Sequence, residues 1–199
     1  MPADAPTIQQ AIDQASAGDT VLIASGTYHE NIDFLGKAIT VEGSGKPSAT
    51  ILDGGGDTVV AIHHGEGRSS ILENLTVQNG APITWQGGGI YISGASPTIQ
   101  DDIIQNNIGC GIGAYNSAPL ISGNVVSGTT EPLTEGIYPI GKFPCTDPSG
   151  EADINTAEGT GIFVYGISTE GLVTEILGNT VTGNIGSPAA MYLADSGVA

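Results

Sequence analysis

The chain has 199 residues, with four Lys or Arg and 21 Asp or Glu, which gives a formal net charge of −17 at pH 7. A surface this acidic repels phosphate backbones and anionic lipid, so we expect no nucleic-acid binding and no membrane association. No apolar run approaches the ~18 residues that a transmembrane helix needs. Glycine fills 31 positions, roughly twice its usual share of ~7%, and this excess predicts many short strands joined by tight turns.

The N-terminal segment predicts a short helix followed by a strand. Its apolar residues share the i, i+3, i+4, i+7 spacing of one helix face: Ile8, Ala11, Ile12 and Ala15. We therefore expect a capping helix over residues 7–17 that covers the first layer of the fold, and a strand at Thr20–Ala24. We expect no signal peptide in this sequence, because Met1 leads directly into a short Pro- and Ala-rich stretch without a long apolar core.

A glycine-rich turn and the histidine pair that follows it carry the first candidate functional groups. Asp53 and Asp57 are candidate Ca²⁺ ligands, because Ca²⁺ prefers oxygen atoms; a turn that binds no ion is the alternative. His63 is a candidate for acid–base chemistry or ligand binding, with an ordinary surface role as the alternative. Neighbouring residues of a strand point to opposite faces, so we expect His63 to point outward and His64 toward the turn, and not to bind one ion together.

From Gly89 onward the sequence repeats itself. The segment Gly89–Ile99 matches Gly111–Ile121 with an offset of 22 residues, a third copy begins at Gly161, and a fourth begins at Met191. Repeats of this length are typical of solenoids, and the alternation of largely β-branched apolar residues predicts strands. The whole chain, 1–199, is therefore expected to be one all-β domain, a parallel β-helix with 22-residue coils.

Two kinds of position recur in the copies. A polar residue stands three places after an isoleucine, and because stacked amides can hydrogen-bond along a stack, we expect one polar column: Asn74, Asp102, Asn124 and Asn179. Apolar residues are expected to form inward rows, with Ile90, Ile112, Ile162 and Met191 in one and Ile92, Ala114, Val164 and Leu193 in the next.

The residues that alternate with these rows point outward, and several are aromatic. This outward face is expected to carry Tyr91, Tyr115, Phe163 and Tyr165, with Trp85 in the segment leading into it. Aromatic rings beside hydrogen-bonding groups stack on sugar rings, so these five side chains are our candidate substrate-binding residues. The alternative is that the rings are covered, either by an inserted segment of this chain or by a second subunit.

One coil carries an acidic, proline-rich insertion at 129–158. Such loops on a rigid scaffold often carry function. Cys145 lies in the insertion and Cys110 precedes it, so the two cysteines are either free thiols or a disulfide that pins the insertion to the body. No capping segment follows Leu193, which predicts a fragment of a longer protein or a last coil that joins a homo-oligomer.

The segments Pro6–Asp13 and Gly18–Ile32 resemble the first coil of the pectin lyase-like right-handed β-helix superfamily, especially that of pectin methylesterases and of bacterial right-handed β-helix exoproteins. Together with the repeats, the resemblance covers nearly the whole chain. It implies a single-stranded right-handed parallel β-helix, an extracellular or cell-surface location, and a polysaccharide partner. It specifies the fold and not the activity, because this superfamily includes lyases, hydrolases, esterases, adhesins and binding modules.

The catalytic motifs of those enzymes are missing from this sequence. Asp101 and Asp102 are similar to the paired aspartates of polygalacturonases, but the companion motifs are absent and Asp102 also fits the polar column. The Gln-Asp-Thr motif that pectin methylesterases would place after Asn79 is absent as well.

We therefore predict an exported module that binds polysaccharide on its outward aromatic face. One version is an enzyme of the lyase or hydrolase type that uses Asp53, Asp57, His63 or a carboxylate of the insertion. The alternative is a non-catalytic structural or adhesin-type segment that associates with itself through its last coil.

Overall fold

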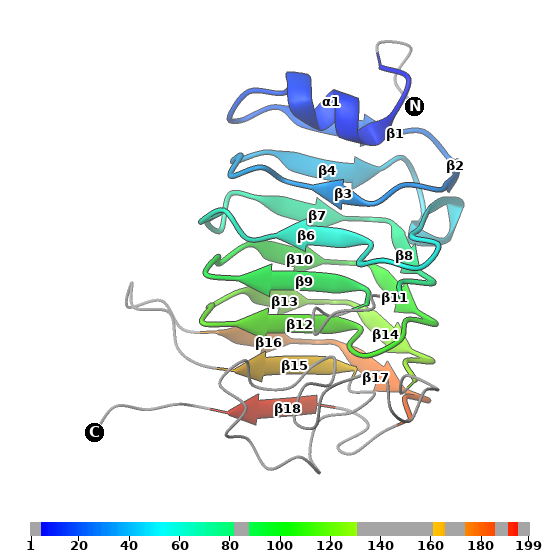
Figure 1. The fold of residues 1–199 in the computed structure, drawn as a ribbon, viewed down its shortest axis with the longest axis vertical. Helices are drawn as coiled ribbons and strands as arrows, with labels where there is room; N and C mark the ends of the chain where they lie inside the picture. The colour runs from blue at the N-terminus through cyan, green and yellow to red at the C-terminus, as the bar shows by residue number, and fades with distance from the viewer. Residues whose placement is uncertain (1–4, 82–87, 131–160, 166–173, 186–190, 195–199) are drawn as a thin grey trace.

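The computed structural model describes residues 5–81, 88–130, 161–165, 174–185 and 191–194. These residues form three parallel β-sheets of six strands each. In each sheet the strands lie across the long axis of the molecule and are stacked along it (Figure 1). Three successive strands make one coil, and each coil adds one strand to each sheet. The predicted parallel β-helix is confirmed.

Each sheet consists of every third strand of the chain. The first sheet stacks β1 (Thr20–Ile23), β4 (Thr40–Gly43), β7 (Ile71–Glu73), β10 (Thr98–Gln100), β13 (Leu120–Ser122) and β16 (Glu175–Leu177). The second stacks β2 (Gly26–Tyr28), β5 (Thr50–Asp53), β8 (Thr76–Gln78), β11 (Ile103–Gln105), β14 (Val125–Ser127) and β17 (Thr180–Thr182). The third stacks β3 (Ile32–Asp33), β6 (Val60–Ile62), β9 (Ile90–Ser93), β12 (Ile112–Tyr115), β15 (Ile162–Tyr165) and β18 (Met191–Ala194). Helix α1 spans Ile8–Gln14, and a 3₁₀ turn, η1, spans Pro47–Ala49.

Strand pairing in the third sheet fixes the rows of side chains that fill the interior. The paired residues are Ile90, Ile112, Ile162 and Met191 in one row and Ile92, Ala114, Val164 and Leu193 in the next. The members of these rows in β9, β12 and β15 are all buried in one apolar cluster. The predicted inward rows are thus confirmed for the members in these three strands. The 22-residue shift is not uniform, however: Val60 pairs with Ile90, 30 residues on, because the turns differ in length while the strands keep their partners.

The predicted polar column holds the corner between the first and second sheets. The Asp102 backbone N–H donates to Asn124 Oδ1 at 3.0 Å, and the Asn124 N–H donates to Asn179 Oδ1 at 2.9 Å. Each coil thus offers a side-chain oxygen to the backbone of its neighbour, which satisfies a donor at a turn where the sheet ladder is interrupted.

Asn74 does not belong to this column, contrary to the prediction. Ile71 pairs with Thr98 and not with Ile99, so Leu75 takes the column position, and its N–H donates to Asp102 Oδ1 at 3.0 Å. Asn74 instead lies one position before the column. The backbone is left-handed immediately before each column residue, and Asn74 has a φ of 58°. Asn tolerates this conformation better than most residues.

A second polar column, absent from the sequence predictions, holds the corner between the second and third sheets. The Gly80 N–H donates to Asn107 Oδ1, and the Thr129 N–H donates to Asn184 Oδ1, both at 2.9 Å. The sequence carried a signal for this column, because its members follow those of the first column by five residues.

The glycines that open the repeats lie where neighbouring coils are in close contact. A Cβ atom on Gly89 would lie 2.3 Å from the carbonyl oxygen of Gly111, and one on Gly111 would lie 2.6 Å from that of Gly161. Any larger residue would push the coils apart, so these glycines are required by the stacking.

Helix α1 covers the first coil, as predicted, but it is shorter than the expected 7–17. Thr7 caps its start by accepting a hydrogen bond from the Gln10 N–H, and Ala15 ends it by adopting an extended conformation. Ile8 and Ile12 are buried in the same apolar cluster as the strand rows.

Two charged side chains from the first coil hold the ends of α1. The Glu30 carboxylate accepts hydrogen bonds from the Ile8 and Gln9 N–H groups at 2.9 and 3.2 Å. Lys37 Nζ donates to the carbonyls of Ile12, Asp13 and Ala15 at the other end. An anion at the start and a cation at the end also match the helix dipole.

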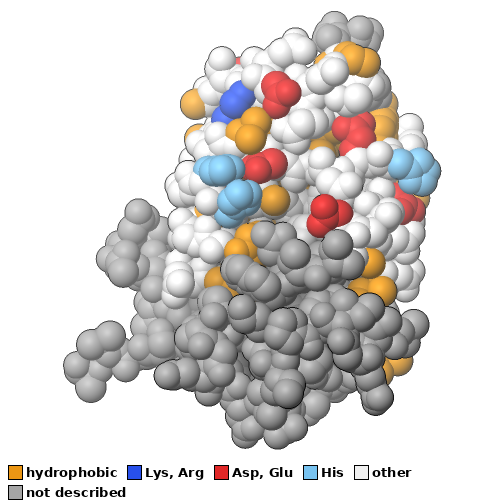
Figure 2. Space-filling view, viewed as in Figure 1, with side chains coloured by type: hydrophobic (Ala, Val, Ile, Leu, Met, Phe, Trp, Pro, Cys, Tyr) orange, Lys and Arg blue, Asp and Glu red, His pale blue; other side chains and the backbone are white. Residues whose placement is uncertain are grey.

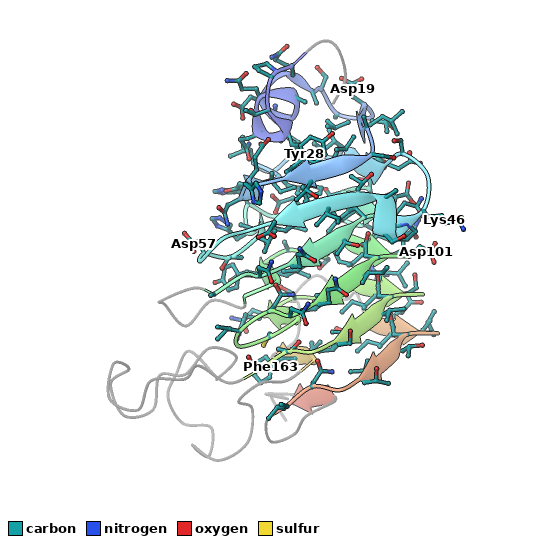
Figure 3. All side chains as sticks on the ribbon, turned by 90° about the vertical axis from the view of Figure 1, so that its right-hand side faces the viewer. Asp19, Tyr28, Lys46, Asp57, Asp101 and Phe163 are labelled. Atoms are coloured by element: carbon teal, nitrogen blue, oxygen red, sulfur yellow. The ribbon has the colours of Figure 1, made fainter. Side chains whose placement is uncertain are left out.

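Lys37→Met removes the donor shared by three carbonyl groups, so we expect the free energy of unfolding to fall by about 1–3 kcal/mol, measured by urea denaturation. Lys46→Met is the matched control, because Lys46 is exposed and lies away from the helix (Figure 3). Equal effects of the two substitutions would contradict a capping role for Lys37.

Asp102 places a carboxyl group in a column whose other polar members, Asn124 and Asn179, are amides. It is 1% exposed, and this burial raises its pKa well above the usual range; the Leu75 hydrogen bond lowers the pKa, and the charges of Glu73 and Asp101 raise it. Asn124 Nδ2 donates to the Ile99 carbonyl, whereas Asp102 Oδ2 has no hydrogen-bond partner among the described residues.

Asp102→Asn should therefore stabilise the protein at neutral pH by about 1–3 kcal/mol, because the amide supplies a donor and removes a buried acid. A raised folded-state pKa means that wild-type stability falls as pH rises above the unfolded-state value of ~3.9. The advantage of the variant should thus grow as pH rises from about 4, as followed by urea denaturation across pH. Asp101→Asn, at the exposed neighbouring position, should change stability far less; a pH-independent gain at residue 102 would contradict this account.

Candidate functional site

Three side chains that can exchange protons or bind a metal ion meet at the carboxyl ends of two neighbouring strands of the third sheet. Asp33 ends β3, and His63 and His64 follow β6, which pairs with β3. Asp33 Oδ2 lies 3.2 Å from His63 Nε2 and 3.3 Å from His64 Nε2. The two imidazole centroids are 4.1 Å apart. Figure 2 shows a pair of adjacent histidines at the surface beside an acidic side chain.

The convergence of His63 and His64 corrects the sequence prediction that they point to opposite faces. Alternation holds only within a strand, and β6 ends at Ile62. Beyond that point the chain turns, and the Glu66 carboxylate holds the turn by accepting a hydrogen bond from the His64 N–H at 2.8 Å. Both imidazoles can therefore face Asp33.

Glu66 also joins the two turns that carry the site. Its other carboxylate oxygen accepts a hydrogen bond from the Gly36 N–H at 2.9 Å, so one side chain spans the turn after Asp33 and the turn after His63. Glu66 is only 2% exposed. Neither Glu66 nor Asp33 was predicted from the sequence, because neither lies at the 22-residue period from the histidines.

The Asp33 carboxylate is itself held in place. Its Oδ1 accepts a hydrogen bond from the Leu35 N–H at 2.8 Å, which directs Oδ2 to the histidines. The Asp33 backbone is fixed by Gln9 of α1, whose side-chain oxygen accepts from the Asp33 N–H and whose nitrogen donates to the Asp33 carbonyl. The capping helix thus has a second role as a support for the site.

A groove with a volume of about 230 Å³ lies beside this cluster. Its lining residues are Gln9, Asn31, Ile32, Asp33, Asp57, Thr58, Ala61, His63 and Tyr91. Asn31 is fixed by donating to the carbonyls of Gly54 and Thr58. The groove therefore presents amide, carboxylate, imidazole and phenol groups on a supported surface.

Tyr91, Tyr115 and Phe163 occupy the predicted outward rows, but the exposed aromatic face expected from them is wrong. Successive ring centroids are 6.2 Å apart from His63 to Tyr91, 5.7 Å from Tyr91 to Tyr115, and 5.4 Å from Tyr115 to Phe163. Yet Tyr91, Tyr115 and Phe163 are only 7%, 1% and 1% exposed. The alternative of covered rings applies, and of the three only Tyr91 reaches the groove.

The buried aromatic cluster also contains Cys110, which is disulfide-bonded. Cys145 is the only other cysteine of the chain. Cys145, Trp85 and the Tyr165 side chain lie outside the described residues, as does the insertion at 129–158 apart from Thr129 and Thr130.

Asp53 and Asp57, the candidate Ca²⁺ ligands, have hydrogen-bonding roles in the structure. Asp53 Oδ2 accepts from the side-chain amides of Gln78 and Asn79 at 3.1 and 2.8 Å. Burial raises the pKa of Asp53, but these two hydrogen bonds, the nearby His29 and a hydrogen bond from the Gly55 backbone together lower it below its usual value. Asp57 Oδ1 accepts from the Thr58 N–H, and Asp57 lies at the outer edge of the molecule (Figure 3). Among the described residues, the group suited to an ion is Asp33, His63 and His64.

The fold and the groove define a parallel β-helix protein with a polar cleft at the edge of its third sheet. The chain belongs to the family described as "Protein of unknown function (DUF1565)", which matches residues 33–143, more than half of the chain. No curated protein sequence matches it. No helix among the described residues is long and apolar enough to cross a membrane.

The chain is similar in structure to pectin methylesterase. One crystal structure of that enzyme, in complex with a hexasaccharide, matches with a TM-score of 0.50 and 15% identity over 63% of this chain. The match spans 46% of the enzyme chain, less than half of its length. A second, of a variant enzyme with a hexasaccharide, gives a TM-score of 0.42 and 14% identity over 93% of this chain and 71% of that one. The first likeness confirms the predicted right-handed β-helix fold.

Tyr115→Ala tests whether the aromatic rows serve packing. Truncating a buried ring should lower the free energy of unfolding by about 3–5 kcal/mol, measured by urea denaturation. Leu177→Ala is the control, because Leu177 is an exposed apolar residue on β16, and it should cost far less. Similar small effects of both substitutions would contradict the burial of Tyr115.

Proposed function

We propose that this protein binds a neutral polysaccharide in the groove beside Asp33 and His63. The observation that carries the proposal is the composition of that groove, in which hydrogen-bonding side chains lie beside Tyr91. Sugars are bound by such combinations, with hydroxyl groups paired to fixed polar atoms and ring faces against aromatic or apolar surface. The fold likeness to an enzyme seen with a hexasaccharide supports the same class of ligand.

The polar groups of the groove are held before a ligand arrives. Gln9 and Asn31 make hydrogen bonds to backbone groups of neighbouring coils, and Asp33 is held by the Leu35 N–H. Groups fixed in this way lose little conformational freedom on binding, which favours affinity.

The charge of the groove favours a neutral polymer over a polyuronate. Asp33 and Asp57 line it, and none of its described lining residues is Lys or Arg. The chain as a whole carries a net charge of −17. The two aspartates and the net charge of the chain would repel a uronate carboxylate. The hydroxyl groups of a neutral sugar would instead donate hydrogen bonds to the two aspartates.

Export to the cell surface or medium forms part of the proposal. The disulfide bond of Cys110 supports it, because disulfides persist mainly in oxidising compartments.

A second candidate is a structural module that associates with itself. Strands β16, β17 and β18 each end their sheet, and their outer edges are not paired with another described strand. Such edges are able to pair with a second copy of the chain. Light scattering across a concentration series distinguishes this candidate, because self-association would raise the molecular mass without any glycan.

The binding proposal is tested by affinity electrophoresis in gels containing neutral glucans, mannans or xylans, with polygalacturonate as the acidic comparison. We expect retardation by at least one neutral polymer and none by polygalacturonate. Ala61→Trp should abolish the retardation by filling the groove, while Ala24→Trp, the same substitution at an exposed site elsewhere, should leave it unchanged.

Circular dichroism of both variants checks that the fold is kept, and reducing-end assays on the same polymers test for turnover. Retention by none of the neutral polymers, or equal retention of the Ala61→Trp variant and the wild type, would overturn the proposal.

A further inference from the structure

We propose that Asp33, His63 and His64 form a binding site for a single Zn²⁺ ion, with one coordination position open toward solvent. The inference concerns an ion and not a glycan, so it does not depend on the proposed function.

The spacing of the ligand atoms matches a tetrahedral zinc site. With Zn–N and Zn–O bonds of about 2.0–2.2 Å, neighbouring ligand atoms of a tetrahedron lie ~3.3–3.5 Å apart. The separations from Asp33 Oδ2 to His63 Nε2 and His64 Nε2 are 3.2 and 3.3 Å. All three ligand atoms lie within 4.8 Å of one another, so a small rotation of one exposed imidazole brings the third separation into range.

The ligand types select zinc over calcium. Two of the three ligands are imidazole nitrogens, which suit Zn²⁺ and related transition metals, whereas Ca²⁺ and Mg²⁺ favour sites built from oxygen atoms. The site is therefore distinct, in place and in chemistry, from the Ca²⁺ site that the sequence suggested at Asp53 and Asp57.

The carboxylate and the two turns are fixed independently of an ion. The Leu35 N–H holds Asp33 Oδ1 and leaves Oδ2 for the metal, and the buried Glu66 carboxylate clamps the backbones of His64 and Gly36 together. Supports of this kind orient metal ligands and raise affinity.

Three protein ligands leave the fourth tetrahedral position for water or an exogenous ligand. The side chains of His63, His64 and Asp33 are 38%, 45% and 28% exposed, so an ion can enter from solvent. Asp33 and His63 also line the groove, which places the open position near any molecule bound there.

Hydrogen bonds alone are the competing explanation for the same distances. In that case both Nε2 atoms donate protons to Asp33 Oδ2, and no ion is required. In the zinc site both Nε2 atoms are unprotonated and the protons lie on Nδ1. The two explanations differ in whether zinc changes the spectra of these imidazoles.

The test is titration of the chelator-treated protein with ZnCl₂, followed by calorimetry and by NMR of the histidine rings, without glycan and with excess CaCl₂ to occupy sites made of carboxylates alone. We expect one ion per chain and shifts of the His63 and His64 ring signals but not of His29. His63→Ala, His64→Ala and Asp33→Asn should each weaken binding more than tenfold. His29→Ala, the matched control at an exposed position of the first coil, should bind as the wild type does.

Asp33→Asn keeps an oxygen for the Leu35 N–H, so loss of zinc binding in this variant is not a folding defect. Zinc should also raise the melting temperature of the wild type and of His29→Ala but not of the three site variants. No binding of zinc, or binding that survives both histidine substitutions, would overturn the proposal. Because no glycan is present, failure here and failure of polysaccharide binding are separate results.

Discussion

The parallel pairing of each strand with the strand one coil away is the interaction on which the structure depends. It brings Ile90, Ile112 and Ile162 into one buried row, although they are far apart in the sequence. Pairing alone would leave donors unsatisfied where the chain turns from sheet to sheet. The columns that contain Asn124 and Asn107 satisfy them with side-chain oxygens, so the same stacking that builds the core also closes two of its corners.

The third corner is built differently, and the candidate site lies there. In the first two coils, the turns from the third sheet back to the first begin after Asp33 and after Ile62 and differ in length. They are joined by a single buried carboxylate, that of Glu66, and not by a repeating amide. In the later coils the same corner follows the 22-residue repeat, and there a serine joins neighbouring turns, because the Ala95 N–H donates to Ser117 Oγ at 3.3 Å. The candidate site therefore lies where the turns of this corner depart from the repeat.

The sequence was sufficient for the core and insufficient for the site, for a physical reason. Ile90 and Ile112 could be aligned because the copies that hold them have equal length, and period-two alternation then placed Tyr91 and Phe163 outside the core. What covers an outward side chain is not encoded in its own strand, so the sequence left the burial of these rings as an alternative to an exposed binding face. The meeting of Asp33 with His63 depends on the pairing of Ile32 with Val60, a shift unlike the repeat. It also depends on the end of β6, where alternation stops.

The distribution of the few cationic groups limits what the groove can bind. Lys37 caps helix α1, and Arg68 lies 3.3 Å from Glu175, so these basic side chains serve the fold. An acidic surface repels polyanions and concentrates cations near it. Carboxylates alone would hold such cations weakly and without selection. In the proposed zinc site, a pair of imidazoles against one carboxylate adds selectivity for a transition metal, and the groove beside it is the one proposed for a neutral polymer.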